Sequence, residues 1–150
     1  MGFGGLGRLT LGRLGASGGG SSGPPELVAD SSFDSGVGWI DVSLGTAVPT
    51  FAASEVSLPR PDGSNIARIR QVISTEIGKT YTLRTDASVS TIKFGVGTSA
   101  LDDSLLDKLA FTGQTIEEDF VATTTSTHIS VIGTTNGTTP KSSFLSIKKS

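Results

Sequence analysis

Two acidic clusters come closest to a catalytic pattern in this sequence. The first holds three aspartates, and the second two glutamates and an aspartate: Asp102, Asp103 and Asp107, then Glu117, Glu118 and Asp119. Two carboxylates roughly 5–9.5 Å apart in a cleft can hydrolyse a glycosidic bond. Both clusters fall in polar connections or at strand starts, where carboxylates are ordinarily solvated. We therefore assign no catalytic residue and expect the chain not to be an enzyme.

Other reactive side chains are scarce. The chain has no cysteine and one histidine, which excludes disulfide scaffolds, thiolate zinc sites and multi-histidine metal centres within one chain. His128 has serines and threonines nearby but no Gly-x-Ser-x-Gly elbow, so we expect an exposed strand residue. Gly95-Val96-Gly97 lacks the third glycine and the helix of a dinucleotide site, and indicates only a kinked strand.

Composition narrows the class of protein. The chain has 150 residues, 20 glycines, 17% charged residues and a formal charge of -2, which fits one turn-rich domain. This charge provides no basic field for nucleic acid. No stretch approaches the roughly 20 continuous apolar residues of a membrane span, so we expect no membrane insertion.

Residues 26–150 read as a series of short strands separated by Gly, Pro, Asp or Asn. The expected strands are Glu26–Ala29, Trp39–Leu44, Phe51–Leu58, Ile66–Ser74, Thr80–Ala87, Thr91–Gly97, Ile116–Ala122, His128–Gly133 and Ser143–Lys148. Such regular spacing is typical of an all-β sandwich or barrel. We predict an antiparallel β-sandwich of about eight or nine strands, large enough to fold without metals or disulfides.

Alternation within these strands predicts which side chains point outward. Ile66, Arg68, Arg70 and Val72 share one face of their strand, and Arg84 lies on a neighbouring strand. The three arginines could together contact an acidic partner or an anionic glycan. Alternatively, the three arginines form an ordinary solvated face, and this is the interpretation that we prefer.

Residues 99–109 fit two structures. Ser99 and Asp102 form a capping-box start, and Leu101, Leu105 and Leu109 then fall on one helical stripe. A short helix is therefore one prediction. A polar connection that leads into a strand over 105–111 is the other, and the sequence does not separate them.

Residues 1–25 form a second region, a Gly-rich arm and linker. They hold ten of the 20 glycines and no acidic residue. Glycine disfavours helix by about 1 kcal/mol per residue, so we expect the arm to take its shape only on a partner surface. Its anchoring residues would be Phe3, Leu6, Arg8, Leu9, Leu11, Arg13 and Leu14. A tail without such a role is the alternative.

Several segments of 26–148 resemble the jelly rolls of carbohydrate-binding modules. They include the turn Ser31-Ser32-Phe33-Asp34-Ser35-Gly36 before Gly38-Trp39, the turn Gly78-Lys79-Thr80-Tyr81, Phe94-Gly95-Val96-Gly97-Thr98, the Thr-rich pair around Phe120 and Ile129, and the closing strand Phe144-Leu145-Ser146-Ile147. Such domains occur in polysaccharide enzymes and in bacteriophage tail, fibre and capsid-surface proteins. The Gly-Leu-Gly-Arg arm resembles small phage virion proteins.

The resemblance implies a function and a set of site residues. It implies a virion protein, either a capsid decoration, a head fibre or a tail-associated protein, whose arm docks on capsid, collar or tail and whose copies form a homo-oligomer. The jelly roll could then bind host-surface polysaccharide, with Arg68, Arg70, Arg84, Tyr81 and Trp39 as candidate contacts. A stand-alone carbohydrate-binding module is the alternative.

The family's structural calcium and its aromatic platforms are weakly matched. Asp34 could serve as a calcium ligand, but Ser146 stands where the family's second aspartate is expected. Ca²⁺ needs six to eight oxygen ligands, so we expect no cofactor, with calcium at Asp34 as the open alternative. The resemblance places Trp39 in the core, and alternation places Tyr81 there as well.

Overall fold

The computed structural model describes residues 23–150, and this range contains eleven strands and no helix. The strands are β1 (Ile40–Asp41), β2 (Thr50–Phe51), β3 (Val56–Ser57), β4 (Arg68–Ser74), β5 (Thr80–Ala87), β6 (Ile92–Gly97), β7 (Leu106–Ala110), β8 (Gln114–Val121), β9 (Ser126–Gly133), β10 (Lys141–Ser142) and β11 (Leu145–Lys149). Among the described residues no helix is long and apolar enough to cross a membrane.

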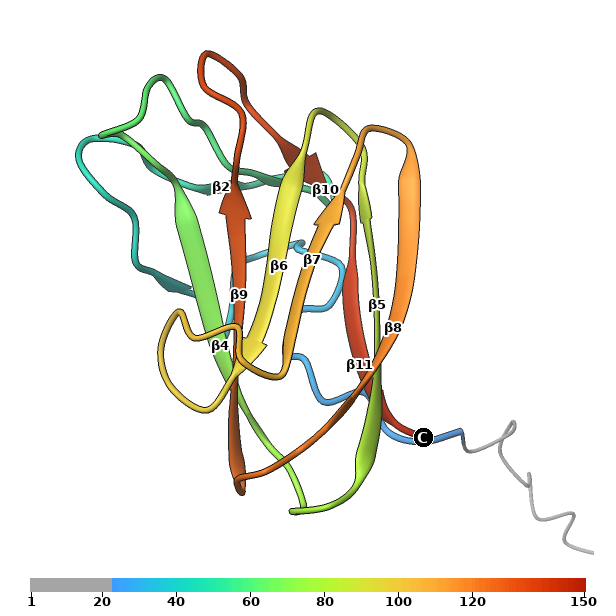
Figure 1. Ribbon diagram of the computed structural model, residues 1–150. Helices are drawn as coiled ribbons and strands as arrows, with labels where there is room; N and C mark the ends of the chain where they lie inside the picture. The colour runs from blue at the N-terminus through green and yellow to red at the C-terminus, as the bar shows by residue number, and fades with distance from the viewer. Residues whose placement is uncertain (1–22) are drawn as a thin grey trace, which may run out of the picture.

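The strands form two layers, with every pairing antiparallel (Figure 1). One layer is a five-stranded sheet in the order β1-β4-β9-β6-β7, and the other contains the three-stranded sheet β11-β5-β8. A third, small sheet in the order β10-β3-β2 lies toward one end, at the top of the view. The prediction of an all-β antiparallel sandwich is confirmed.

The core between the layers is filled by alternate residues of the long strands. In β4 the side chains of Ile69 and Ile73 are buried. Those of Arg68, Arg70 and Val72, which alternate with the buried residues, point to the other side. In β9, Ile129 and Val131 are fully buried, and the same holds for Leu83 in β5. The expected outward face of Arg68, Arg70 and Val72 is therefore confirmed, because a period of two separates the faces of a strand.

Two expected strands differ in the structure. Residues 26–29 form no strand, although the Leu27 amide donates a hydrogen bond to the Ile147 carbonyl oxygen at 3.0 Å. The expected strand over 51–58 is instead the hairpin of β2 and β3. Its turn residues Ala53 and Ser54 both have positive φ, as a two-residue hairpin turn requires. Neither residue is the usual Asn or Gly, so the sequence gives no turn signal.

The segment 99–109 is a loop followed by strand β7, not a helix. The Asp102 carboxylate accepts hydrogen bonds from the Thr98 and Ser104 amides at 2.8 and 3.1 Å, which closes a compact loop. Leu101 has φ of 61°, which no helix allows. β7 then pairs with β6, so the strand alternative is correct.

Residues 1–22, which hold nearly all of the arm, lie outside the described residues. The anchoring residues Phe3, Leu6, Arg8, Leu9, Leu11, Arg13 and Leu14 therefore remain predictions, as does the domain boundary at residue 25.

Candidate functional site

The outer face of β11, β5 and β8 presents two rows of polar side chains. The register of the three strands places one residue from each strand in each row. The first row is Ser146, Arg84 and Glu117, and the second row is Lys148, Thr82 and Asp119. A groove of about 210 Å³ runs over this face, lined by Thr82, Arg84, Glu117, Ser146 and Lys148. Acidic side chains from β8 form one wall, and basic side chains from β5 and β11 face them.

Arg84 is the central residue of the groove and is only loosely held. Its Nε lies 3.8 Å from Oε2 of Glu117, and the two side chains are 61% and 66% exposed. The guanidinium also lies 5.8 Å from the centroid of the Phe144 ring, close enough for a cation–π contact. An exposed ion pair contributes only about 0–1 kcal/mol, so a ligand can replace Glu117 as a partner of Arg84 at little cost.

Hydroxyl groups add short hydrogen bonds along the groove. Thr82 Oγ1 donates to Asp119 Oδ1 at 2.6 Å, and Ser146 Oγ donates to the carboxylate of Glu26. Both hydroxyls keep lone pairs that can accept a further hydrogen bond. The groove thus offers donors and acceptors side by side, which suits a ligand rich in hydroxyl groups, because each hydroxyl both donates and accepts.

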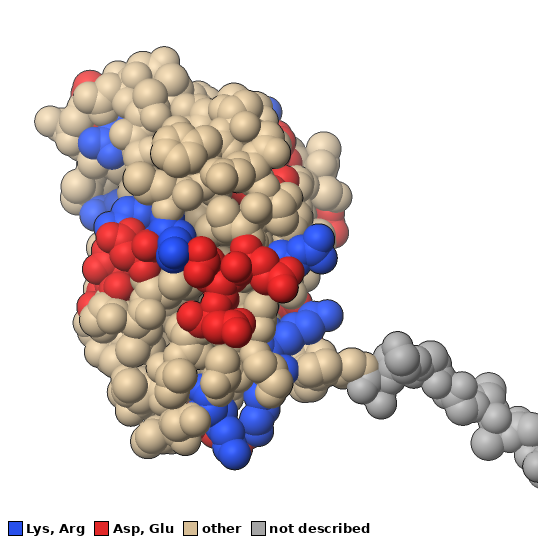
Figure 2. All heavy atoms as spheres, turned by 45° about the vertical axis from the view of Figure 1, so that its right-hand side comes forward, with Lys and Arg blue, Asp and Glu red and all other residues tan. Residues whose placement is uncertain are grey.

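Charges gather on the side of the molecule where β7 and β8 lie. Figure 2 turns this side forward and shows acidic side chains near its middle, with basic side chains around them. One ion pair here joins the two layers, because Lys108 Nζ of β7 lies 2.9 Å from Oε1 of Glu118 in β8.

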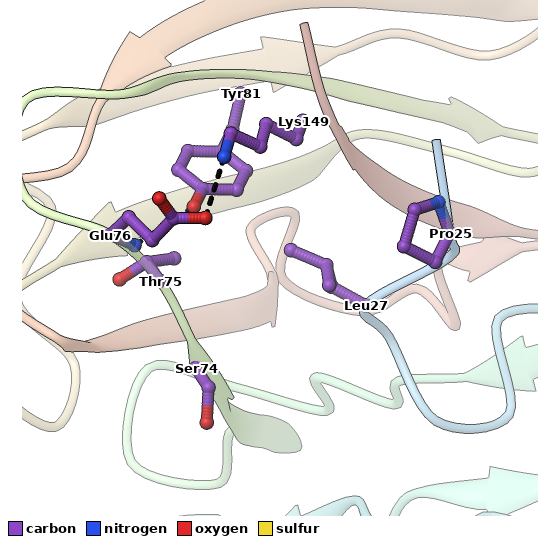
Figure 3. A pocket seen from close by; sticks show the side chains of 7 residues that line it. All are labelled: Pro25, Leu27, Ser74, Thr75, Glu76, Tyr81 and Lys149. Atoms are coloured by element: carbon purple, nitrogen blue, oxygen red, sulfur yellow. Dashed lines mark hydrogen bonds and ion pairs between the residues drawn. The ribbon is translucent and has the colours of Figure 1, made fainter. Parts of the chain in front are cut away.

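A second hollow of about 270 Å³ lies where the described chain begins (Figure 3). Pro25 and Leu27 form one side of it and Tyr81 the other, so its walls are largely apolar. Glu76 and Lys149 form an ion pair at this pocket, and the hydrogen bond from Lys149 lowers the pKa of the Glu76 carboxyl. The pocket therefore lies close to residue 23, where the described part of the chain begins.

The two acidic clusters have structural partners. Four hydrogen bonds from Thr98 and Ser104 lower the pKa of Asp102 to about 2. Lys93 Nζ lies 2.5 Å from Asp103 and 3.3 Å from Asp107, and these contacts raise the pKa of Lys93. A general acid needs a carboxyl with a raised pKa. Within residues 23–150, every carboxyl pKa that departs clearly from its ordinary value is lowered.

Gly95 and Gly97 have a role that the sequence did not reveal. A Cβ at Gly95 would lie 2.6 Å from Ser130 Oγ and 3.1 Å from Cβ of Asp103. A Cβ at Gly97 would meet the carbonyl oxygen of Asp102. The two glycines therefore make room for the β6–β7 loop, which folds back over the outer face of β6.

His128 lies on the outer side of β9, opposite Val72 in β4 and Gly97 in β6. It is half-buried, so the expectation of an exposed residue was wrong. Its Nδ1 is buried and has no hydrogen-bond partner among residues 23–150. No group of three or more potential metal-binding side chains occurs in that range.

The three arginines do not share one face. Arg68 and Arg70 lie on β4 in the five-stranded sheet, whereas Arg84 lies on β5 in the three-stranded sheet. The expectation of neighbouring strands was wrong because the connection after β4 crosses from one layer to the other. Only Arg84 lines the groove.

Trp39 and Tyr81 are core residues. Trp39 is 9% exposed, and its ring packs against Phe33 with the centroids 5.3 Å apart. Tyr81 is 2% exposed, stacks on Phe120, and accepts a hydrogen bond from the Glu76 amide at 2.9 Å. Their placement in the core is confirmed, and neither ring offers an open face to a ligand.

Asp34 is held by hydroxyl groups. It accepts hydrogen bonds from Ser32 and Ser54 at 2.7 and 2.5 Å, and these bonds lower its pKa. The position expected for a second calcium ligand is Ser146, which donates to Glu26 instead. A direct hydrogen bond thus joins the segment before β1 to the last strand at this point.

Sequence reasoning identified Arg84 but not the residues beside it. Thr82, Ser146 and Lys148 alternate with buried neighbours, which marks them as outward-facing. The missing signal was the pairing of β5 with β8 on one side and β11 on the other, since these strands are far apart in the sequence.

No protein-family model and no curated protein sequence matches the chain. Solved structures share its fold. The enzymatically active domain of tailspike protein 4 of bacteriophage CBA120 superposes with a TM-score of 0.62 and 13% identity over 83% of this chain and 21% of that one. The carbohydrate-binding module CBM4 gives a TM-score of 0.59 and 15% identity over 82% and 99% of the two chains, and CBM1 of BiXyn10A gives 0.58 and 16% over 80% and 95%.

These likenesses show the fold, a β-sandwich of the carbohydrate-binding-module type. The chain spans about a fifth of the tailspike chain and nearly all of CBM4. The jelly-roll resemblance read from the sequence is therefore confirmed at the level of the fold.

Proposed function

We propose that the chain is a non-catalytic glycan-binding protein of a bacteriophage virion, with the groove over β11, β5 and β8 as its binding site. The observation that carries the proposal is this groove, in which Arg84 and Lys148 face Glu117 on the outer surface of the sheet. Its fold is shared with carbohydrate-binding modules, which supports the same reading.

The chemistry of the groove favours an uncharged sugar. Arg84 and Lys148 face Glu117 in the groove, and Asp119 lies beside Thr82 in the neighbouring row, so the basic and acidic side chains of the two rows balance. Carboxylate and guanidinium groups form charge-assisted hydrogen bonds with hydroxyl groups, each contributing about 1.5–3 kcal/mol. An anionic sugar placed against Arg84 would lie close to Glu117 and be repelled by it.

The groove is small, which predicts weak binding by a single copy. Its volume of about 210 Å³ is below the range of about 300–1,000 Å³ typical of drug-sized sites. Several copies on one particle would raise the overall affinity by a factor of about 10²–10⁴ through multivalency. A repeated polysaccharide on a host surface suits such an arrangement.

The virion assignment rests on the arm and on the tailspike likeness. Residues 1–25 combine Gly-rich backbone with apolar and basic side chains, which suits docking into grooves of a capsid, collar or tail protein. The apolar pocket of Pro25, Leu27 and Tyr81 lies at the end of this arm, so the same partner surface would contact it. The copies would form a homo-oligomer on the particle.

Titration calorimetry tests the glycan-binding site. We expect a neutral bacterial polysaccharide to bind the full chain and an acidic one to bind more weakly. Arg84→Ala should lower the affinity about 10–100-fold. Arg70→Ala is the matched control, because Arg70 lies on the other sheet and should leave affinity unchanged. Equal effects of the two substitutions would exclude the groove.

Deletion of residues 1–25 tests the anchoring role. The virion reading predicts that the remaining body folds and binds glycan but no longer joins particles, as judged by mass spectrometry of purified particles. A stand-alone carbohydrate-binding module is the second candidate, favoured by the coverage of nearly all of CBM4. A stand-alone module predicts that the deletion leaves glycan binding unchanged. It also predicts that neither the full chain nor the shortened chain associates with particles.

The assignment as a non-enzyme is tested with the acidic clusters. When Asp102, Asp107, Glu117 or Glu118 is replaced by alanine in the full chain, the measured rate of polysaccharide cleavage should be the same as with the wild-type chain. A rate that falls by orders of magnitude at one of these positions would identify a catalytic carboxylate.

A further inference from the structure

The outer face of the five-stranded sheet carries exposed aliphatic side chains beside its charged ones. Ile40 in β1, Val72 in β4 and Leu109 in β7 lie on this face and are 46%, 43% and 47% exposed. Leu44, which forms a bridge with Ile66 next to β4, is 45% exposed. The inner face of the same strands already fills the core. An antiparallel sheet with one face on the core normally has a polar outer face.

Exposed aliphatic side chains on one sheet face mark a contact surface. The groove face on the opposite layer, built from Thr, Ser, Arg, Lys and Glu side chains, shows that this sandwich can form a polar outer face. The five-stranded face therefore differs from the groove face, because its exposed aliphatic side chains suit contact with another apolar surface.

Charges divide this face into two halves. Arg68 and Arg70 of β4 form no ion pair with an acidic side chain of residues 23–150. On the other half, Lys93 of β6 lies between Asp103 and Asp107, so two carboxylates share one ammonium group. β9 and β6 lie between β4 and β7. With neighbouring strands about 4.8 Å apart, β4 and β7 are therefore about 14 Å apart. One half is thus basic and the other acidic.

We infer that this face binds a second copy of the same chain in a two-fold symmetric dimer. A two-fold axis near β9 and β6 places the arginines of one copy against the acidic half of the other, twice per interface. The aliphatic side chains of β1 and β7, the outer strands of the sheet, then lie toward the edges of the interface, where they pack against the partner copy. The arm is a poorer occupant, because its charged side chains are Arg8 and Arg13 and would meet Arg68 and Arg70.

The size of the face sets the expected strength. Five strands at about 4.8 Å spacing and a length of 7 residues in β4 give a face of at most about 24 by 23 Å, and the β6–β7 loop already covers part of it over Gly95 and Gly97. The free area therefore lies below the roughly 600–800 Å² per partner that stable interfaces bury. We therefore expect a dimer that dissociates in the micromolar range. The inference rests on this face alone and is independent of glycan binding.

Sedimentation equilibrium of the full chain from about 1 to 200 µM tests the inference. We expect the mass to rise from 15.3 kDa toward twice that value with concentration. Arg70→Glu should weaken the dimer at least about tenfold, and so should Asp107→Arg, because each places like charges together across the interface. An equimolar mixture of the two variants should recover the dimer, since each altered residue then meets its opposite charge.

Two controls keep the outcome decisive. Arg84→Glu reverses a charge on the opposite layer and should leave the dimer unchanged. Circular dichroism melting of each variant checks that the fold is retained. A wild-type chain that stays monomeric up to 200 µM would overturn the inference and assign the face to a different partner. A mixture of the two variants that stays monomeric would overturn the two-fold arrangement.

Discussion

The two outer faces of this sandwich differ more than the two inner faces do. Both inner faces are aliphatic and aromatic, because both fill the same core. Outside, the layer of β11, β5 and β8 presents Thr82, Arg84 and Ser146, whereas the five-stranded layer presents Ile40, Val72 and Leu109. Since an outer face has no part in the core, its composition reflects what covers it. One face suits a hydroxyl-rich ligand in water, and the other suits a protein surface.

The largest expected effect separates the inner from the outer face of β4. Ile69→Ala removes a fully buried side chain and should lower the free energy of unfolding by about 2–5 kcal/mol. Val72→Ser on the outer face should change it by no more than about 0.5 kcal/mol. Urea denaturation below the dimerisation range measures both. A large loss from Val72→Ser would mean that this face stabilises the monomer.

A smaller effect is expected where the five-stranded face is covered by its own loop. Gly97→Ala places a Cβ against the backbone of Asp102 and should lower the free energy of unfolding by about 1–3 kcal/mol. Gly63→Ala is the matched control, since a Cβ there would have open space around it. Thermal melting of both variants makes the comparison. Equal melting temperatures would show that the loop moves away freely.

On the groove face, the lining residues other than Arg84 should each matter less. Thr82→Ala removes one hydroxyl and Lys148→Ala removes one ammonium group. Each should weaken glycan binding about fivefold, which corresponds to about 1 kcal/mol for one hydrogen bond. Calorimetric titration of the full chain measures the change. If His128→Ala weakens binding more than these two, the ligand occupies the five-stranded face instead.

The smallest effect concerns the pH dependence of the β6–β7 loop. The pKa of Asp102 is lowered from 3.8 to about 2 by hydrogen bonds from Thr98 and Ser104. A group with a lowered pKa stabilises the fold above its ordinary pKa, and this stabilisation is lost as the pH falls toward the lowered value. The melting temperature should therefore fall slightly more between pH 4 and pH 2 for the wild-type chain than for Asp102→Asn. Parallel curves for the two proteins would assign the loop's stability to other contacts.

Alternation of residue types predicted the fold well but the pairing of strands poorly. Arg68, Arg70 and Val72 were placed on one outer face of β4 correctly because a period of two is a local property. The grouping of Arg84 with Arg68 failed because it depends on which layer a strand enters, and that choice is made by packing across the whole chain.

The candidate site was predictable only in part for the same reason. Arg84 was identified as an outward residue, but Ser146 reaches the groove only because β11 pairs with β5. Trp39 and Tyr81 were correctly assigned to the core, so it could be foreseen that these two rings form no part of the groove. The close approach of residues 98–104 to Gly97 could not be predicted, because the only local sign of it in the sequence is the glycine itself.

Chemical-shift mapping of the full chain with a bound neutral glycan tests the central claim most directly. The account predicts that backbone amide signals move at Thr82, Arg84, Glu117 and Ser146, while those of Arg70 and Ser130 on the other layer stay in place. The account would be contradicted if only the amide signals of Arg70, His128 and Ser130 moved. It would also be contradicted if no amide signal moved with any glycan that binds the chain.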